Sequence, residues 1–209
     1  MLLLPLGLAA AWTPAPQGPC DVYASAGTPC VAAHSMGRAM YAAYAGPLYS
    51  LSRSSDNTTL DIGVKPGVGF ADAAPQLTFC TNPSPTVCTV ERIYDQSGRG
   101  NHLERVRIRP NNTNQWPTAG INAMRDPTSL GGHTIYSAYF EGGEHIGSGT
   151  MGFRSNRLNG DASGVAVGDE PESVYMVTAG NRFNHGCCFD CARGPTPLPV
   201  CCILPSTLS

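Results

Sequence analysis

Two adjacent cysteines, Cys187 and Cys188, have a spacing that indicates unusual chemistry. One peptide unit holds their Cα atoms about 3.8 Å apart, whereas an ordinary disulfide prefers a separation of about 4.4–6.8 Å. If the two sulfurs bond to each other, they form a strained, rigid and largely apolar ring that suits one face of a small ligand. The alternatives are that each cysteine pairs with a distant partner, or stays reduced and buried. Spacing alone does not choose among them.

Paired carboxylates are the other candidates, because hydrolysis of a glycosidic bond needs two carboxyl groups flanking that bond. Glu141 and Glu144 surround a Gly-Gly pair, and Asp169, Glu170 and Glu172 form a second acidic group. Both groups lie in predicted loops, where acidic side chains are usually solvated, so neither is assigned as the catalytic couple. A serine nucleophile is not favoured either, because the sequence has no Gly-x-Ser-x-Gly motif.

The segment 94–103, Tyr-Asp-Gln-Ser-Gly-Arg-Gly-Asn-His-Leu, follows a predicted strand. Asp and Ser beside two glycines are typical of a tight turn braced by side chains, which favours a structural corner. The functional alternative is that Asp95, Asn101 or His102 binds a sugar hydroxyl. The histidines of the chain do not have the spacing of a metal site. We therefore expect no metal and no cofactor.

Composition argues against several classes of partner. The 209 residues include 13 basic and 15 acidic side chains, without a long run of either sign. Neither nucleic acid nor a membrane surface is therefore an expected partner. The 24 glycines and 18 prolines favour short strands joined by many turns over a helical bundle.

The N-terminus and the cysteines predict export. Residues 1–11 form an apolar run that closes on three alanines. The run is half the length of about twenty residues that a membrane-spanning helix needs, and we interpret it as a signal peptide rather than a buried strand. Residues 12–19 then form a proline-rich spacer. Nine cysteines indicate an oxidising compartment, and sequons at Asn57 and Asn111 fit a glycosylated, secreted, extracellular protein.

A single domain of antiparallel strands is the predicted architecture that positions these residues. Thr28 and Pro29 are a typical N-cap and first helical residue, so a helix is predicted over the Ala-rich segment 31–44. Three segments rich in β-branched and aromatic residues are predicted strands: 87–94, 134–140 and 173–178. The predicted fold class is all-β, a β-sandwich of the jelly-roll, concanavalin-like kind with a short N-terminal helix.

Several collinear motifs resemble one family of glycosidases. The block from Cys20 to Ser35, which begins Cys-Asp-Val-Tyr-Ala-Ser and includes Cys30, looks like the mature N-terminus of the fungal and bacterial α-L-arabinofuranosidases of glycoside hydrolase family 54, the arabinofuranosidase B type. The resemblance is essentially continuous from Cys20 to Asp190. Further matches follow in the family's order at 41–49, 93–103, 152–156, 168–169, 174–175 and 186–190.

The resemblance implies a secreted, retaining α-L-arabinofuranosidase that releases terminal α-L-arabinofuranosyl groups from arabinoxylan, arabinan and related plant cell-wall polysaccharides. It implies a β-sandwich catalytic domain followed by a β-trefoil arabinose-binding module, and we expect a monomer. It also implies that the adjacent cysteines form a disulfide that packs against the arabinose in the substrate pocket. The disulfides it implies are Cys20–Cys30, Cys80–Cys88 and Cys187–Cys188.

After Asp190 the chain departs from the family pattern, which continues with a segment like Tyr-Gly-Asn-Ala-Glu. Residues 191–209 contain four prolines and three cysteines, and a translated intron or a shifted reading frame is the expected origin of this non-family tail. The family's nucleophile, a Glu, and its acid/base, an Asp, both lie beyond the departure. Residues 20–190 are therefore interpreted as a partial catalytic domain, an incomplete sandwich with unpaired strand edges and no meaningful hydrolysis.

A non-catalytic carbohydrate-binding module of the lectin or laminin-G type is the alternative function. Such jelly rolls also use turns like Asp-Gln-Ser-Gly at 95–98. The Cys20 to Cys30 block and the adjacent cysteines argue against this alternative, because lectin-like modules do not need them.

Overall fold

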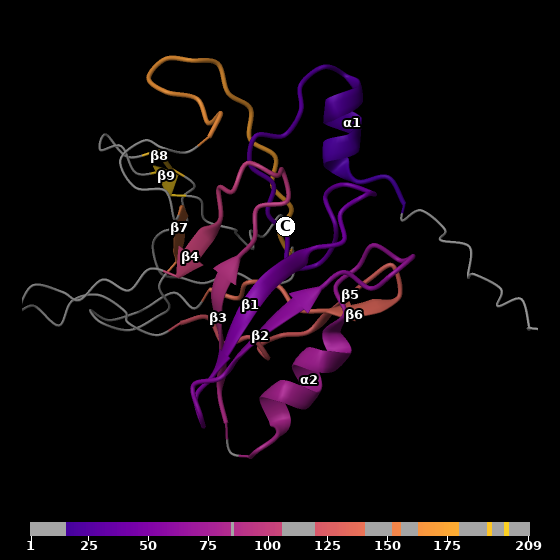
Figure 1. Ribbon diagram of the computed structural model, residues 1–209, viewed down its shortest axis with the longest axis vertical. Coiled ribbons are helices and arrows are strands. Elements are labelled where there is room, and N and C mark those ends of the chain that lie inside the picture. The colour runs from indigo at the N-terminus through magenta and orange to yellow at the C-terminus, as the bar shows by residue number, and fades with distance from the viewer. Residues whose placement is uncertain are drawn as a thin grey trace, which may run out of the picture.

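The computed structural model describes residues 16–84, 86–105, 120–140, 152–155 and 163–179, together with the backbone of two further short strands. The elements in chain order are α1 (Pro19–Ser25), β1 (Pro47–Arg53), β2 (Thr59–Gly63), α2 (Ala73–Thr81), β3 (Cys88–Ile93), β4 (Leu103–Arg105), β5 (Thr128–Leu130), β6 (His133–Ile135), β7 (Phe153–Ser155), β8 (Ala192–Arg193) and β9 (Pro199–Val200) (Figure 1).

A five-stranded antiparallel sheet with the order β2-β1-β3-β4-β7 crosses the molecule (Figure 1). β5 pairs with β6, and β8 pairs with β9, in two-stranded antiparallel ribbons. The described residues are thus mostly β-structure with two short helices. The sandwich arrangement of the sheets stays a prediction.

One face of the five-stranded sheet forms the hydrophobic core. Tyr49 of β1 lies between Ile62 of β2 and Ile93 of β3, and Ile93 lies opposite Leu103 of β4. All four side chains are at most 1% exposed. The register of β3 against β1 shifts at Glu91, so Val90 and Ile93 both face the core although they are three residues apart. Such a bulge reorients a strand without ending its pairing.

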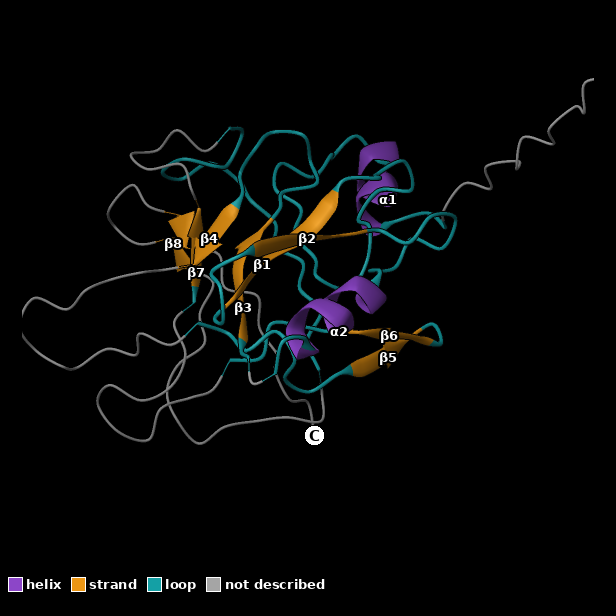
Figure 2. Cartoon of the chain, turned by 60° about the horizontal axis from the view of Figure 1, so that its bottom comes forward, coloured by secondary structure: helices purple, strands orange, loops and turns teal. Residues whose placement is uncertain are grey.

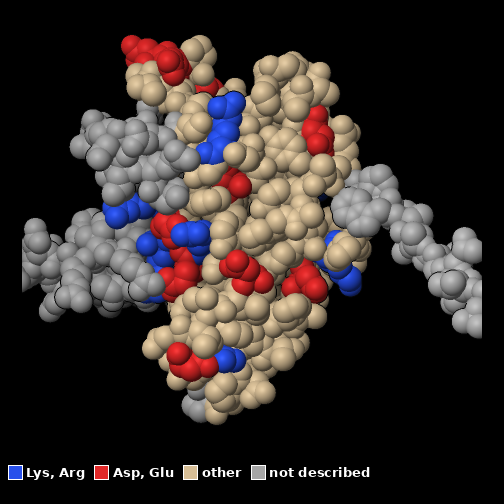
Figure 3. Space-filling model, viewed as in Figure 1, with Lys and Arg blue, Asp and Glu red and all other residues tan. Residues whose placement is uncertain are grey.

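The opposite face of the sheet is polar, because side chains alternate between the two faces of a strand. Its registers place one polar or charged residue of each strand in a continuous row, in which Arg92 Nε donates to Glu104 Oε1 at 2.6 Å. Acidic and basic side chains lie intermixed over β3 and β4 in Figure 3. The row runs from Asp61 through Ser50, Arg92 and Glu104 to Arg154.

The first helix lies earlier than the sequence predicts. α1 begins at Pro19, whose ring suits the first helical position. The carboxylate of Asp21 accepts the Gly18 N–H at 2.7 Å and the Ala42 N–H at 2.7 Å. Gly18 is required here, since a Cβ at this position would collide with the Met40 carbonyl. These contacts fix α1 against the chain that follows it.

The helix predicted over 31–44 is wrong, because this segment gives its N–H groups to distant acceptors. Ala33 donates to the Asp95 carboxylate at 2.8 Å, and Met40 donates to the Gln96 side chain at 2.7 Å. Ala39 donates to the Gly69 carbonyl at 2.8 Å. Tertiary hydrogen bonds thereby replace the intrahelical ones that the Ala-rich composition favours.

The strand predictions have mixed outcomes. β3 confirms the strand predicted at 87–94, whereas 134–140 contributes only the last two residues of β6 to a ladder. Tyr136, Ala138 and Phe140 are nevertheless buried in the core. The strand predicted at 173–178 is wrong, since these residues form no strand and 173–177 are exposed. β1, β2 and α2 were not predicted from the sequence.

Two disulfides fasten the helices. Cys20–Cys30 joins α1 to the loop after it, with the Cα atoms 5.6 Å apart, and Cys80–Cys88 joins the end of α2 to the start of β3, with the Cα atoms 5.5 Å apart. Both separations lie in the ordinary range for a disulfide. The chain between α2 and β3 is therefore closed into a short loop.

A buried glutamine connects α2 to the sheet. Gln76 is 0% exposed. It accepts the Tyr49 hydroxyl at 2.5 Å and donates to the Ala123 carbonyl at 2.7 Å. Figure 2 shows α2 beside the sheet and next to the β5–β6 ribbon. Because buried polar groups must be paired, Gln76 specifies how α2 packs.

We expect Gln76→Ala to lower the free energy of unfolding by about 2–4 kcal/mol. The substitution opens a cavity and leaves the Tyr49 hydroxyl and the Ala123 carbonyl buried without their partner. Urea denaturation followed by circular dichroism measures the loss. Thr78→Ala, on the exposed side of the same helix, is the control and should change stability by less than about 1 kcal/mol. Equal losses in the two variants would contradict this role of Gln76.

Candidate functional site

The carboxylate of Asp95 is the centre of the polar cluster that follows β3. Asp95 is 5% exposed. Its Oδ1 accepts the Ala33 N–H at 2.8 Å and the Ser97 N–H at 2.9 Å. Its Oδ2 accepts the Ser97 hydroxyl at 2.7 Å and the Asn101 N–H at 2.9 Å. Both carboxylate oxygens are therefore occupied by donors from within the fold.

The neighbours of Asp95 extend this network to the loop after α1. Gln96 donates its N–H to the Ala33 carbonyl at 2.7 Å and accepts the Met40 N–H. Asn101 Nδ2 donates to the Val31 carbonyl at 2.8 Å. Gln96 and Asn101 are 4% and 3% exposed. The loop after α1 is thus held to the β3–β4 connection along most of its length.

Residues 163–164 contact the same connection. Asn101 donates to the Ser163 carbonyl at 3.0 Å, and its Oδ1 accepts the Ser163 N–H at 2.9 Å. Gly164 follows with φ +75°, and a Cβ there would collide with the Arg99 guanidinium. The amide of Asn101 therefore joins segments more than sixty residues apart in the sequence.

Two histidines complete the cluster. His34 Nε2 donates to the Asn101 carbonyl at 2.7 Å. His102 Nδ1 accepts the Asp95 N–H at 3.0 Å, and its ring lies edge-on to Tyr94 with the centroids 5.3 Å apart. Tyr94 in turn donates to Asp61 at 3.0 Å. These bonds fix one tautomer for each neutral ring: His34 carries its hydrogen on Nε2, and His102 lacks one on Nδ1.

Opposing effects set the charges in the cluster. Burial on its own raises the pKa of Asp95, but hydrogen bonds from Ser97, Ala33 and Asn101 outweigh it and leave that pKa below its ordinary value. Burial lowers the pKa of His34, only partly offset by its bond to the Asn101 carbonyl and by the Asp95 charge. The cluster therefore holds an ionised carboxylate beside a neutral imidazole at neutral pH.

This geometry is that of a structural corner. The polar atoms of Asp95 and Asn101 bind the protein's own backbone and side chains. His102 Nδ1 likewise accepts the Asp95 N–H, so the alternative in which Asp95, Asn101 or His102 binds a sugar hydroxyl finds no support in the described contacts. The sequence identified the turn of Asp95 and Ser97 but missed His34, whose role depends on a carbonyl 67 residues away.

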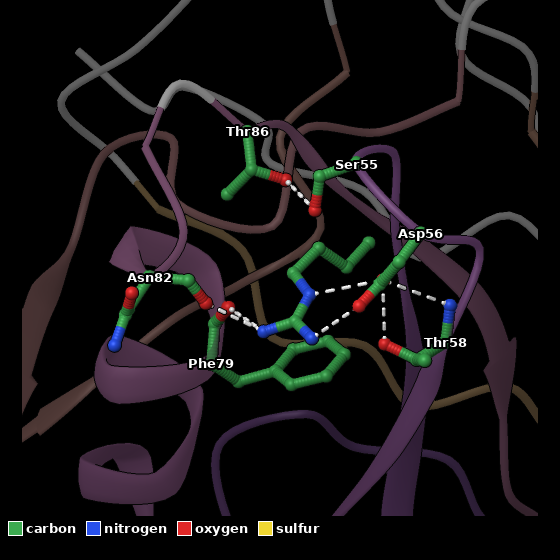
Figure 4. Close-up of polar contacts among 7 residues, drawn as sticks. Ser55, Asp56, Thr58, Phe79, Asn82 and Thr86 are labelled. Carbon is green, nitrogen blue, oxygen red and sulfur yellow. Dashed lines mark hydrogen bonds and ion pairs between the residues drawn. The ribbon is translucent and has the colours of Figure 1, made fainter.

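A second polar cluster surrounds Arg53 at the end of β1 (Figure 4). Arg53 contacts Asp56 at 2.6 Å, donates to the carbonyls of Phe79 and Asn82, and lies over the Phe79 ring. The hydrogen bond from Arg53 holds the pKa of Asp56 below its usual range. An open groove of about 680 Å³ adjoins this cluster. Since Arg53 is already bound to these acceptors, the cluster joins the β1–β2 turn to the end of α2.

Several predicted site residues lie outside the described residues. They are Cys187, Cys188, Glu141, Glu144 and Asn111. The second acidic group is described and forms a surface loop: Asp169, Glu170 and Glu172 are exposed, and Glu170 accepts the Val167 N–H at 2.7 Å. Within the described part of the chain, this group has the character of a solvated loop.

The Asn57 sequon lies at an exposed turn. Asn57 connects β1 to β2 with φ +57°, a left-handed conformation that asparagine tolerates better than most residues.

Among the described residues, three or more potential metal ligands do not come together anywhere. In the same part of the chain, neither helix has the length and apolarity to span a membrane.

The catalytic-domain model described as "Alpha-L-arabinofuranosidase B, catalytic" matches residues 19–196. The match covers most of the chain. The chain belongs to the arabinofuranosidase B family, glycoside hydrolase family 54. Membership confirms the resemblance that the collinear motifs indicate.

Relatives from several Aspergillus species agree with this assignment. A probable α-L-arabinofuranosidase B of Aspergillus flavus is 43% identical over 189 residues, which cover 88% of this chain and 34% of the relative. The α-L-arabinofuranosidase B of Aspergillus oryzae shows the same identity and coverage. One from Aspergillus terreus is 43% identical over 196 residues, covering 91% of this chain and 35% of the relative. The chain thus spans about a third of the length of these relatives.

Solved structures show the same similarity in three dimensions. A crystal structure of an arabinofuranosidase complexed with arabinofuranosyl-α-1,2-xylobiose matches with a TM-score of 0.61 and 40% sequence identity. A family 54 arabinofuranosidase soaked with a cyclic sulfate inhibitor gives the same values. Each match covers 74% of this chain and 30% of the other.

We expect Asp95→Asn to lower the free energy of unfolding by about 3–5 kcal/mol. An amide would turn one of its own donors toward N–H and O–H groups that now donate to the carboxylate. Chemical denaturation measures the loss. Asp61→Asn is the matched control, since Asp61 is exposed and accepts the Tyr94 hydroxyl, and should lose less than about 1 kcal/mol. An Asp95→Asn variant as stable as this control would rule out the corner.

The lowered pKa of His34 predicts that the folded protein loses stability in mild acid. The folded-state pKa of this histidine lies below its ordinary value of about 6.5. Below that pH the unfolded chain binds a proton that the folded chain does not, so stability is fully present above about pH 6.5 and falls as the pH drops through about 6. Asp95, whose pKa is also lowered, adds a further loss below about pH 4.

Urea denaturation from pH 5 to pH 8 measures this dependence. In His34→Gln, an uncharged amide replaces the donor to the Asn101 carbonyl. The free energy of unfolding of this variant should therefore change less between pH 5 and pH 6.5 than that of the unaltered protein. His133→Gln is the control, since His133 stacks on Phe70 away from the cluster, and it should keep the slope. An unchanged slope in His34→Gln would show that another group causes it.

Proposed function

We propose that this chain carries the first part of the catalytic domain of a secreted, retaining α-L-arabinofuranosidase. The enzyme would release terminal α-L-arabinofuranosyl groups from arabinoxylan, arabinan and related plant cell-wall polysaccharides. The observation that carries the proposal is the match of residues 19–196 to the catalytic-domain family. The 40% identity to an arabinofuranosidase crystallised with arabinofuranosyl-α-1,2-xylobiose supports this class of substrate.

We propose residues 20–190 as the partial catalytic domain, after a signal peptide at 1–11 and a spacer at 12–19, and before a non-family tail at 191–209.

The five-stranded sheet would be one layer of a β-sandwich. Its division into an apolar face and a polar face supports this, because a sandwich layer buries one face against its partner. The two disulfides and the exposed Asn57 sequon support an extracellular location.

The adjacent cysteines would form one wall of the arabinose pocket. A disulfide between Cys187 and Cys188 would be rigid and largely apolar, and would lie against one face of the furanose ring. The family resemblance supports this role. Cys187 and Cys188 lie just before Asp190, after which the chain departs from the family pattern.

The reaction would proceed through two carboxylates. A Glu would attack the anomeric carbon and form an arabinosyl-enzyme intermediate, while an Asp would protonate the leaving oxygen and then activate water. The resemblance places both residues after the position of Asp190. Residues 191–209 contain no Asp or Glu, so we expect the polypeptide of these 209 residues to bind arabinose at most.

A graft tests the proposal. We expect the 209-residue polypeptide to release no nitrophenol from 4-nitrophenyl α-L-arabinofuranoside. Residues 20–190, placed in the α-L-arabinofuranosidase B of Aspergillus oryzae instead of the aligned segment, should restore hydrolysis to within about tenfold of that enzyme. A well-folded graft without activity, or activity in the 209-residue polypeptide, would contradict the proposal.

The same graft tests the cysteine pair. Replacing Cys187 and Cys188 by serine should lower kcat/KM about tenfold or more, because the sugar would lose an apolar wall in the pocket. Asp169→Asn, in the exposed acidic loop, is the control and should leave kcat/KM unchanged. A double serine variant with unaltered kcat/KM would remove these cysteines from the pocket.

A further inference from the structure

The turn between β1 and β2 carries a glycosylation sequon whose reactive groups the fold does not use. The motif is Asn57-Thr58-Thr59, in which the Asn receives the sugar and the third residue must be Ser or Thr. All three residues are exposed. Among the contacts of the described residues, the side chains of Asn57 and Thr59 take part in no hydrogen bond. Both groups that the modification needs are therefore accessible.

Other groups hold this turn in place. Asp56 Oδ1 accepts the Thr58 N–H at 3.1 Å and the Thr58 hydroxyl at 2.7 Å (Figure 4). Both oxygens of Asp56 also accept from the Arg53 guanidinium. The Asn57 N–H donates to the Arg53 carbonyl, and the Arg53 N–H donates to the Thr58 carbonyl, each at 2.9 Å. The turn thus keeps its shape without a contribution from the Asn57 amide.

The backbone around the sequon is equally independent of these two side chains. Asn57 has φ +57°, a conformation that Asn and Asp adopt several times more often than other non-glycine residues. Thr59 is the first residue of β2 and lies opposite Ser52 of β1, and a strand ladder uses backbone groups rather than a hydroxyl. A sugar attached to Asn57 would displace water rather than protein contacts.

We propose that Asn57 is an N-glycosylation site of this chain. Asn57 Nδ2 forms a bond to the anomeric carbon of an N-acetylglucosamine that belongs to a lipid-linked oligosaccharide diphosphate. The bond from that carbon to the diphosphate oxygen breaks, the lipid diphosphate leaves, and Nδ2 loses one proton. An oligosaccharyltransferase of the secretory pathway performs the transfer, so the proposal rests on the export that the proposed function includes.

A solvated turn that carries no glycan is the competing interpretation, because exposed Asn and Thr are ordinary turn residues. The two interpretations differ in what they require of the threonines. The fold uses the hydroxyl of Thr58, whereas a transferase accepts any residue except proline at that position. The fold makes no use of the Thr59 hydroxyl, whereas a transferase requires it.

Translation of the 209-residue chain in the presence of endoplasmic-reticulum microsomes tests the proposal. An Asn111→Gln background removes the other sequon, which lies outside the described residues. We expect a glycosylated product that peptide N-glycosidase converts to the unmodified size. The same treatment in heavy-oxygen water should place the isotope label at residue 57, as read by mass spectrometry of the peptides.

The two threonines supply matched variants in that background. Thr59→Ala should lower the glycosylated fraction by about tenfold or more, and Thr59→Ser should retain about half of it or more. Thr58→Ala is the control and should leave the fraction unchanged, although it removes a hydrogen bond to Asp56. Equal glycosylation in Thr59→Ala and Thr58→Ala would overturn the proposal.

A version in which the leader of the Aspergillus oryzae α-L-arabinofuranosidase B replaces residues 1–11 separates this proposal from that of the signal peptide. Glycan at Asn57 behind the foreign leader, but not behind residues 1–11, would support the site and contradict the signal peptide. A chain that the microsomes protect from added protease, yet that carries no glycan at Asn57, would overturn the site.

Discussion

The carboxylate of Asp95 is buried, and it stays ionised because two stretches of the chain, the loop after α1 and the β3–β4 connection, supply donors to it. Removing a carboxylate from water is costly unless its lone pairs are satisfied. Ala33, Ser97 and Asn101 satisfy them, and the same bonds fix the loop after α1 against the β3–β4 connection. Asn101 then extends the network to Ser163. The path of the loop after α1 and of the β3–β4 connection therefore depends on that one charge.

In the core of the sheet, apolar burial dominates, and a single polar residue directs how α2 packs. Tyr49, Ile62, Ile93 and Leu103 form a cross-strand core, and such packing alone would tolerate several positions of a covering helix. Gln76 selects one position, because its amide must meet both the Tyr49 hydroxyl and the Ala123 carbonyl. The Cys80–Cys88 disulfide then limits how far α2 can move from β3.

Membership of the arabinofuranosidase B family gives these features a context. The chain spans about a third of the length of its Aspergillus relatives, and its described residues provide a framework joined by buried hydrogen bonds and disulfides rather than a reacting pair of carboxylates. The corner at Asp95 belongs to this framework.

Features that depend on neighbours along the chain could be predicted from the amino-acid sequence. The turn of Asp95 and Ser97, the strand at 87–94 and the family motifs from Cys20 to Asp190 could be identified because short patterns specify them. The path of residues 31–44 depends instead on tertiary contacts, since Ala33 and Met40 donate to residues 62 and 56 positions away. Residues 173–178 have the composition of a strand but do not form one. A strand needs a second strand to pair with, and the composition of a segment does not reveal whether such a partner is present. Local propensities are weak, and long-range hydrogen bonds and pairing partners override them.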